Sequence, residues 1–242
     1  MIKTDILIIG AGPTGLFTVF EAGLLKMKCH ILDSLTQPGG QCIELYPKKP
    51  IYDIPGYPEI IAGDLIENLL EQIKPFQPSY TLGETALNLD KLDDGSFKVT
   101  TDKGTEILAK IIAIAGGLGT FTPRKPNISN ISDYENKGIL YMIKDPSEFK
   151  DKKVVIAGGG DSALDWSIQL SKISKKLILI HRRNEFRGAD DSVASVQKLK
   201  DLGKIDVITP AQVEKLNGKS RLESIIIDVD GNKSKIETDY FI

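Results

Sequence analysis

Apolar positions along this chain fall into short runs that glycine-rich turns interrupt. Residues 5–33 read DILIIGAGPTGLFTVFEAGLLKMKCHILD, and residues 153–181 read KVVIAGGGDSALDWSIQLSKISKKLILIH. Each stretch holds a β-branched run, a glycine turn, a helix-length segment and a second apolar run. The two stretches align without a gap, so the chain contains an internal repeat. Because parallel strands need a helical crossover, each repeat predicts a strand–helix–strand unit.

Two such units far apart in the sequence predict an α/β protein with two doubly wound, Rossmann-like dinucleotide-binding domains. Residues 84–106 alternate in polarity and contain DDG and DKG, which indicate hairpin turns. We therefore expect an antiparallel β-meander inserted in the first domain, followed by a core strand at 110–115. The Gly- and Pro-rich GGLGTFTPRKP predicts the boundary between a first domain, 1–117, and a second, 118–242.

Composition narrows the class of protein. The 242 residues are 41% hydrophobic and 26% charged with a net charge of −2, which argues against a nucleic-acid binder that depends on phosphate contacts. The apolar runs are too short to span a bilayer, and the first strand leaves no room for a signal peptide, so we expect a cytoplasmic location and no membrane. Two cysteines without a CxxC pair and two histidines predict no metal site and no catalytic side chain.

The first glycine turn has the spacing of a dinucleotide-binding turn. Gly10, Gly12 and Gly15 form G-x-G-x-x-G directly after an apolar run, and Asp33 follows Gly10 by 23 positions. The glycines permit a tight turn, close approach of a pyrophosphate and close helix–strand packing, and the carboxylate suits a ribose 2′-hydroxyl. The alternative is a tight turn that binds nothing. The spacing favours FAD or NAD.

The second turn differs from the first where its second strand ends. Gly158 and Gly160 match the first two glycines, and Ala163 takes the third position, which the pattern permits. His181 stands at the position that corresponds to Asp33. A carboxylate at this position would repel a 2′-phosphate, whereas a basic residue would not.

Basic residues continue beyond that strand end. Arg182 and Arg183 follow directly, and Arg187 lies close in NEFRG. Guanidinium groups pair with phosphate in a bidentate, charge-assisted manner, so this segment favours NADP(H) over NAD(H). The alternative is a solvated basic turn. One site of each kind in one chain suits transfer of a hydride from a nicotinamide to a flavin, in which the cofactors perform the chemistry.

A third stretch after the first repeat, SLTQPGGQCIELYPKKPIYDIPGYP, offers groups for a flat ligand. Its Gly-Gly pair allows close backbone approach, Gln41 offers an amide and Tyr46 a stacking face. A proline-rich surface loop is the alternative. Together, GAGPTG, GGQ…LYP…IYD, AGGLGTFTPRK and GGGDSALDW…HRR resemble the thioredoxin-reductase-like (type 2) ferredoxin/flavodoxin–NADP⁺ reductases over essentially the whole chain.

The resemblance implies a homodimeric flavoprotein that exchanges electrons between NADPH and ferredoxin or flavodoxin through FAD. It places Thr14 and Gln41 at the FAD, Tyr46 against the isoalloxazine, Ala86 at the adenine and Phe121 beside the flavin. The residues expected to bind cofactors are then Gly10, Gly12, Thr14, Gly15, Asp33, Gln41, Tyr46, Ala86, Phe121, Gly158, Gly160, Asp161, Ser162, Ala163, His181, Arg182, Arg183 and Arg187.

Two departures from related patterns bear on function. Thioredoxin reductases carry a CxxC before the second glycine turn, and the corresponding ILYMIKDPSEFKDKK has no cysteine, which disfavours a disulfide reductase. Members of the resembled family continue past the second domain into a segment that completes the first, whereas this chain stops at ETDYFI. We therefore expect an incomplete first domain and weakened FAD binding. A non-catalytic NADP-binding remnant is the third alternative.

Overall fold

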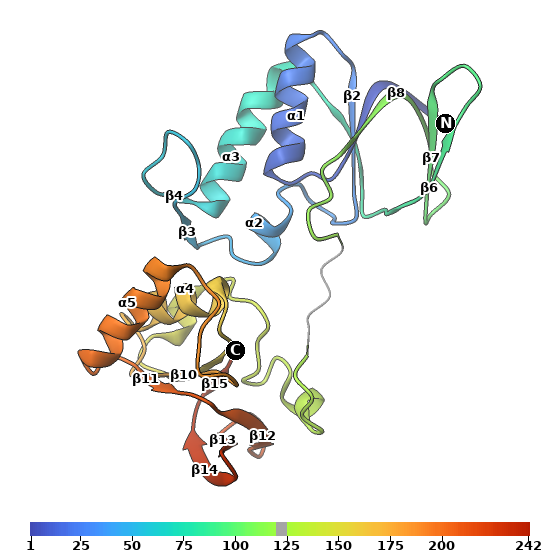
Figure 1. Ribbon diagram of the computed structural model, residues 1–242. Helices are drawn as coiled ribbons and strands as arrows, with labels where there is room; N and C mark the ends of the chain where they lie inside the picture. The colour runs from blue at the N-terminus through green and yellow to red at the C-terminus, as the bar shows by residue number, and fades with distance from the viewer. Residues whose placement is uncertain (120–124) are drawn as a thin grey trace. The chain divides into compact units, whose positions relative to one another are not determined.

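The computed structural model describes residues 1–119 and 125–242 (Figure 1). The chain divides into two compact units, Met1–Thr122 and Pro123–Ile242. Each unit has its own hydrophobic core and its own set of parallel strands.

The first unit is built on one six-stranded sheet, in the order β5-β2-β1-β8-β7-β6. Its elements are β1 (Ile2–Ile9), α1 (Pro13–Leu24), β2 (Cys29–Asp33), α2 (Gln41–Glu44), β3 (Pro50–Ile51), β4 (Ile60–Ile61), α3 (Ala62–Ile73), the 3-10 helix η1 (Lys74–Phe76), β5 (Ser79–Leu82), β6 (Ala86–Lys91), β7 (Phe97–Thr101) and β8 (Glu106–Ile114). Strands β5, β2, β1 and β8 are parallel, and β8, β7 and β6 form an antiparallel meander. The first predicted strand–helix–strand unit and the meander are thus confirmed.

Strand β8 differs from the expectation of a meander at 84–106 followed by a separate strand at 110–115. It is one nine-residue strand, so the third meander strand and the core strand are the same element. It pairs with β1 from Ile2↔Ile107 to Ile9↔Ile114, and its first half also pairs with β7. Strand β1 provides an eight-residue parallel partner. Because β8 pairs along the length of β1, it stays one continuous strand.

Helices cover one face of the parallel strands, and strands β7 and β6 of the meander fold over their other face. Figure 1 shows α1 and α3 together on one side and the β6–β7 hairpin on the opposite side. Side chains of a strand alternate between faces, so Ile6 and Ile8 of β1 pack with Leu16 of α1, while Leu7 packs with Val99 of β7. Burial of each such side chain contributes about 1.5–3 kcal/mol, which holds both layers on the sheet.

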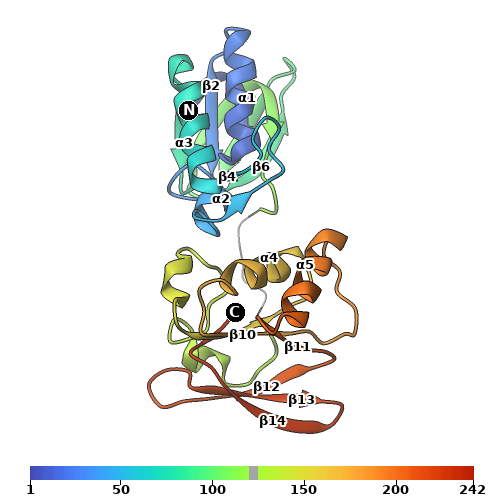
Figure 2. The ribbon, with the colours of Figure 1, turned by 90° about the vertical axis from the view of Figure 1, so that its left-hand side faces the viewer.

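The second unit repeats this plan with a separate antiparallel layer. Its elements are η2 (Ile131–Tyr134), η3 (Pro146–Phe149), β9 (Lys153–Ala157), α4 (Asp161–Leu170), β10 (Lys176–Ile180), α5 (Asp190–Asp201), β11 (Asp206–Ile208), β12 (Gln212–Asn217), β13 (Ser224–Val229), β14 (Asn232–Glu237) and β15 (Tyr240–Phe241). Four parallel strands run in the order β11-β10-β9-β15, and β12, β13 and β14 form a second sheet. Figure 2 shows α4 and α5 on one side of the parallel sheet and the second sheet on the other.

The core of the second unit lies between its two sheets. Val155 of β9 and Ile178 of β10 pack with Ile225 and Ile227 of β13, all of them buried. The second predicted strand–helix–strand unit is therefore confirmed as β9, α4 and β10. Among the described residues, no helix has the length and apolar character needed to cross a membrane.

Candidate functional site

The first glycine turn joins the end of β1 to the start of α1, and its glycines are sterically required. Gly10 has a φ of +111°, and a Cβ at this position would overlap the backbone of Ala115 at the end of β8. A Cβ at Gly15 would overlap the Gly10 carbonyl, so the helix packs directly on the turn. Pro13 occupies the first turn of α1, where a missing N–H has no cost. The turn thus presents the N-terminus of α1 to a ligand.

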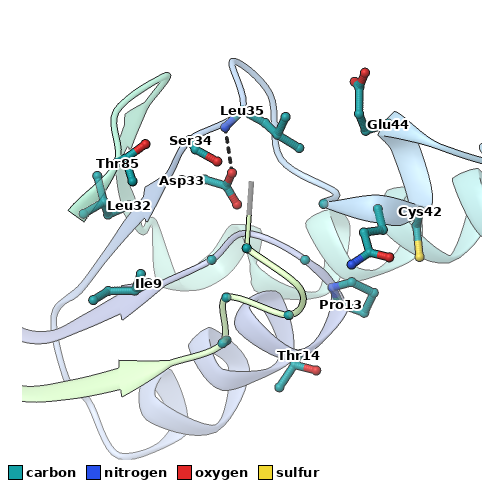
Figure 3. A pocket seen from close by; sticks show the side chains of 18 of the residues that line it. Ile9, Pro13, Thr14, Leu32, Asp33, Ser34, Leu35, Cys42, Glu44 and Thr85 are labelled. Atoms are coloured by element: carbon teal, nitrogen blue, oxygen red, sulfur yellow. Dashed lines mark hydrogen bonds between the residues drawn. The ribbon is translucent and has the colours of Figure 1, made fainter. Parts of the chain in front are cut away.

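Asp33 ties the end of β2 to this turn. Its Oδ2 accepts a hydrogen bond from the Ala11 N–H at 2.6 Å, and its Oδ1 accepts one from the Leu35 N–H at 2.8 Å. Figure 3 shows the Leu35 bond and the carboxylate beside the turn. Two backbone donors therefore hold the carboxylate in place at the position expected for a ribose-binding acid.

A cavity of about 360 Å³ opens over the turn, at the carboxyl ends of the parallel strands (Figure 3). Of the residues expected to bind a cofactor in this unit, it is lined by Gly10, Gly12, Thr14, Asp33, Gln41, Tyr46 and Ala86. Gly15 does not line the cavity and packs beneath the turn. Phe121 lies outside the described residues. The structure thus gathers seven residues from four separate stretches of sequence around one space.

Several lining residues were not expected from the sequence. Glu84 and Thr85 precede β6, and Ala115, Gly116 and Gly117 follow β8. The signal for the second group was present, because a glycine pair directly after an apolar strand beside β1 must lie at the same sheet edge as the first turn.

Cys42 also lines the cavity, whereas its place after a Gly-Gly turn in the sequence favoured a structural role and left redox chemistry as the alternative. It lies in α2 and is buried, and burial raises the pKa of its thiol. Cys29 lies in β2, and both thiols are free. The thiolate is the reactive form of cysteine, and burial disfavours it. Neither cysteine is therefore expected to act as a nucleophile.

Tyr46 is placed to offer an uncharged aromatic face to the cavity. Burial raises its pKa to about 12, and the neighbouring Cys42 adds to this effect. The phenol is therefore neutral at any ordinary pH. The Lys49 Nζ lies 5.8 Å from the ring centroid, within the range of a cation–π contact.

The second glycine turn joins β9 to α4 and has its own steric requirements. A Cβ at Gly158 would lie 2.6 Å from the Ala163 Cβ, so strand end and helix are in close contact. A Cβ at Gly159 would overlap the His181 ring. Asp161 opens α4, directly after Gly160.

The basic segment after β10 folds back against this turn. The Arg187 N–H donates to the Gly159 carbonyl at 2.6 Å, and the His181 ring stacks on Phe186 with centroids 5.6 Å apart. Burial lowers the pKa of His181, and the charges of Arg182 and Arg187 lower it further. His181 Nε2 is buried without a hydrogen-bond partner in the part of the chain that the structure describes.

All the residues expected to bind a nucleotide in the second unit therefore lie on two adjoining segments. The turn and the first turn of α4 carry Gly158, Gly160, Asp161, Ser162 and Ala163, and the segment after β10 carries His181, Arg182, Arg183 and Arg187. The three arginine side chains are exposed. Backbone donors at a helix N-terminus and exposed guanidinium groups fit a ligand that carries more than one phosphate.

Comparison with known proteins defines the class to which this arrangement belongs. The sequence profile of the family described as pyridine nucleotide-disulphide oxidoreductase matches residues 4–242. A ferredoxin–NADP reductase of Flavobacterium johnsoniae is 66% identical over 242 residues, which are all of this chain and 69% of that protein. One from Rickettsia rickettsii is 49% identical over 244 residues, covering all of this chain and 72% of that protein.

Solved structures agree on the fold. A thioredoxin reductase of T. acidophilum superposes with a TM-score of 0.83 at 24% identity, over 100% of this chain and 76% of that one. The thioredoxin reductase of Lactococcus lactis gives 0.82 at 23% identity, over 99% and 76%.

The chain belongs to the pyridine nucleotide-disulphide oxidoreductase family, among the relatives curated as ferredoxin–NADP reductases. The family, the fold class and the oxidoreductase class expected from the sequence are thereby confirmed.

Proposed function

We propose that this chain transfers electrons between NADPH and ferredoxin through FAD, with FAD held by the first unit and NADP(H) by the second. The observation that carries the proposal is the difference between two equivalent strand ends. Asp33 ends β2, whereas β10 leads into His181, Arg182 and Arg183. An acid suits an unphosphorylated ribose and a basic cluster suits a 2′-phosphate, so the two sites are built for different nucleotides.

In the first unit, the chain's residues would bind and orient FAD. Gly12 and Thr14 at the start of α1 line the cavity, where a helix N-terminus would meet the pyrophosphate, and Asp33 is already oriented by two backbone donors to accept from a ribose hydroxyl. Gln41 would hydrogen-bond a ring edge, and the neutral Tyr46 ring would stack on it. When bound, FAD supplies the exchange between a two-electron donor and a one-electron acceptor.

Further contacts at this site complete the proposal. Thr14 lines the cavity at the N-terminal end of α1, and Ala86 lines it at the start of β6, where its backbone would contact the adenine. Phe121 is proposed to lie along the flavin.

In the second unit, the glycine turn would bind the pyrophosphate of NADP(H), and the basic segment would bind its 2′-phosphate. The N–H groups that open α4 would meet the pyrophosphate, with Ser162 among them. Arg182, Arg183 and Arg187 would pair with the 2′-phosphate. We propose 1–117 as the FAD-binding domain and 118–242 as the NADP-binding domain.

The relatives' names support ferredoxin as the electron partner, at up to 66% identity. A disulfide reductase is disfavoured because the chain has only Cys29 and Cys42, which lie in different elements and are both buried. Flavodoxin as a second acceptor, a homodimer, a cytoplasmic location and the absence of nucleic-acid or membrane partners belong to the same proposal. The family resemblance supports flavodoxin and the homodimer, and the net charge of −2 argues against a nucleic-acid partner.

Anaerobic spectroscopy on the purified chain reconstituted with FAD tests the proposal. We expect a flavin spectrum that NADPH bleaches and that ferredoxin then restores, while NADH bleaches it far more slowly. A protein that binds NADP⁺ but cannot be reconstituted with FAD would support the NADP-binding remnant instead. Bleaching by NADPH without reoxidation by ferredoxin would exclude ferredoxin as the acceptor.

A further inference from the structure

Asp161 poses a problem for the NADP(H) site proposed above. It opens α4 directly after the glycine turn, where an anionic pyrophosphate is to lie, and like charges at that distance oppose binding. The first turn has Pro13 at the equivalent position, which carries no charge. A carboxylate at this position therefore calls for a different explanation from direct contact with the nucleotide.

The contacts of Asp161 provide that explanation. Its Oδ1 accepts a hydrogen bond from the Ala189 N–H at 2.7 Å, across 28 residues of sequence. Ala189 directly precedes α5 and ends the segment that carries the three arginines. The carboxylate thus binds the backbone of the basic segment to the first turn of α4.

Two neighbouring contacts hold the same segment. The Arg187 N–H donates to the Gly159 carbonyl at 2.6 Å. At Gly188, a Cβ would lie 2.5 Å from Leu164 Cδ1 and 3.1 Å from Asp161 Oδ1, so the backbone at 188 lies directly on the helix. Residues 187–189 are therefore held at each position, twice by a hydrogen bond and once by close packing.

We infer that Asp161 is a positioning residue that fastens segment 182–189 to the glycine turn, and so holds the arginines where a 2′-phosphate binds. The inference rests on the proposed NADP(H) site. Exposed arginines on a loop lose conformational freedom when they bind, and fastening the backbone beforehand reduces that loss. If the fastened state becomes less populated, the apparent affinity falls by the same fraction. The bond should therefore act on the difference in affinity between ligands with and without a 2′-phosphate, whereas the charge of Asp161 acts on both kinds of ligand alike.

Calorimetric titration of the full chain with NADP⁺, NAD⁺ and 2′,5′-ADP tests this role without requiring flavin. We expect D161A to lower the ratio of NADP⁺ affinity to NAD⁺ affinity about 5- to 10-fold, the equivalent of one lost hydrogen bond. Loss of the negative charge favours both nucleotides alike, whereas loss of the bond weakens only NADP⁺ and 2′,5′-ADP. D161N loses the same charge but keeps an oxygen that can accept the bond, so it should retain the wild-type ratio of NADP⁺ affinity to NAD⁺ affinity. D165A is the matched control: it removes a carboxylate one turn further along α4 that accepts from Ser192 Oγ instead.

Amide hydrogen exchange supplies a second measurement on the same variants. We expect faster exchange across 182–189 in D161A and wild-type rates in D161N and D165A. An unchanged ratio of NADP⁺ affinity to NAD⁺ affinity in D161A would overturn the inference, as would a ratio in D161N as low as that in D161A. Equal affinity of the wild type for NADP⁺ and NAD⁺ would overturn the proposed NADP(H) site itself, and the inference with it.

Discussion

The two glycine turns follow the same backbone plan and are closed by different side-chain pairs. In the first turn, the Ala11 N–H donates to the Asp33 carboxylate at 2.6 Å. At the equivalent positions in the second turn, the His181 ring lies over Gly159, where a Cβ such as that of Ala11 would overlap it. The residue in the turn is therefore coupled to the residue at the strand end, by a hydrogen bond in one unit and by packing in the other.

This comparison explains why the second turn has three consecutive glycines. Gly158 and Gly160 belong to the dinucleotide-binding pattern, but Gly159 does not. It is required because an imidazole occupies the space above it. A histidine at this strand end thus requires a glycine at position 159, so the two positions are coupled.

Removing the basic cluster should have the largest effect. We expect R182A/R183A to weaken NADP⁺ about 30- to 1,000-fold, from the loss of charge-assisted hydrogen bonds worth about 2–4 kcal/mol in total, and to change NAD⁺ affinity little. Equilibrium titration with both nucleotides measures the ratio. An equal loss for both nucleotides would contradict a 2′-phosphate site.

Adding a methyl group at the coupled glycine should have the next largest effect. We expect G159A to destabilise the second unit by about 1–3 kcal/mol, because its Cβ overlaps the His181 ring, and to weaken NADP⁺ binding. Thermal unfolding followed by circular dichroism measures the first effect.

The double variant G159A/H181D tests the coupling directly, since it reproduces the pair of the first turn. We expect recovered stability together with a preference shifted from NADP⁺ towards NAD⁺, because the new carboxylate can accept the N–H at position 159. Stability as low as that of G159A would show that the two positions are independent.

Removing the Asp33 carboxylate beside the first turn should have a smaller effect on stability. D33A leaves the Ala11 and Leu35 N–H groups without their acceptor, which costs about 1 kcal/mol where water can reach them. We expect a modest loss in the thermal midpoint and a clear loss of FAD affinity in fluorescence titration. S34A, at the neighbouring cavity-lining position, is the control and should retain FAD affinity. If S34A loses as much, the carboxylate has no special role.

Lowering the pH should have the smallest effect on stability. Its size in single variants distinguishes the contributions of the two histidines. In the first unit, His30 lies between the Ser79 Oγ, at 2.7 Å, and the Thr81 Oγ1, at 2.9 Å, and burial lowers its pKa. The folded chain therefore takes up a proton less readily than the unfolded chain, whose histidines titrate near pH ~6.5. Stability is present above that pH and is lost as the pH falls below it.

We expect the thermal midpoint of the wild type to fall between about pH 7.5 and about pH 5.5, and to fall less in H30Q. The pH slope, and not the absolute midpoint, is the readout. H181Q should also reduce the pH slope, by the separate contribution of His181, because burial lowers the pKa of that histidine too. Identical slopes in H30Q and the wild type would show that His30 does not contribute.

Local sequence signals were sufficient for most of the fold and for the backbone part of both sites. The repeat predicted β1–α1–β2 and β9–α4–β10, and glycine spacing predicted both turns, because each feature depends on residues close together in the chain. The continuous β8 and the cavity position of Cys42 were not predicted. The first depends on a partner strand about 100 residues away, and the second on how α2 packs beside the turn.

The residue types at each strand end, an aspartate in one unit and His-Arg-Arg in the other, were determined by the sequence alone, since they depend only on spacing from the glycine turn. Only the tertiary structure showed that Gly159 accommodates His181 and that Asp161 holds the backbone of Ala189. These contacts join positions 22 and 28 residues apart whose meeting depends on the path of β10 and the segment after it. Sequence spacing determines which side chains are available at each turn. Tertiary packing determines which backbone segments those side chains hold in place.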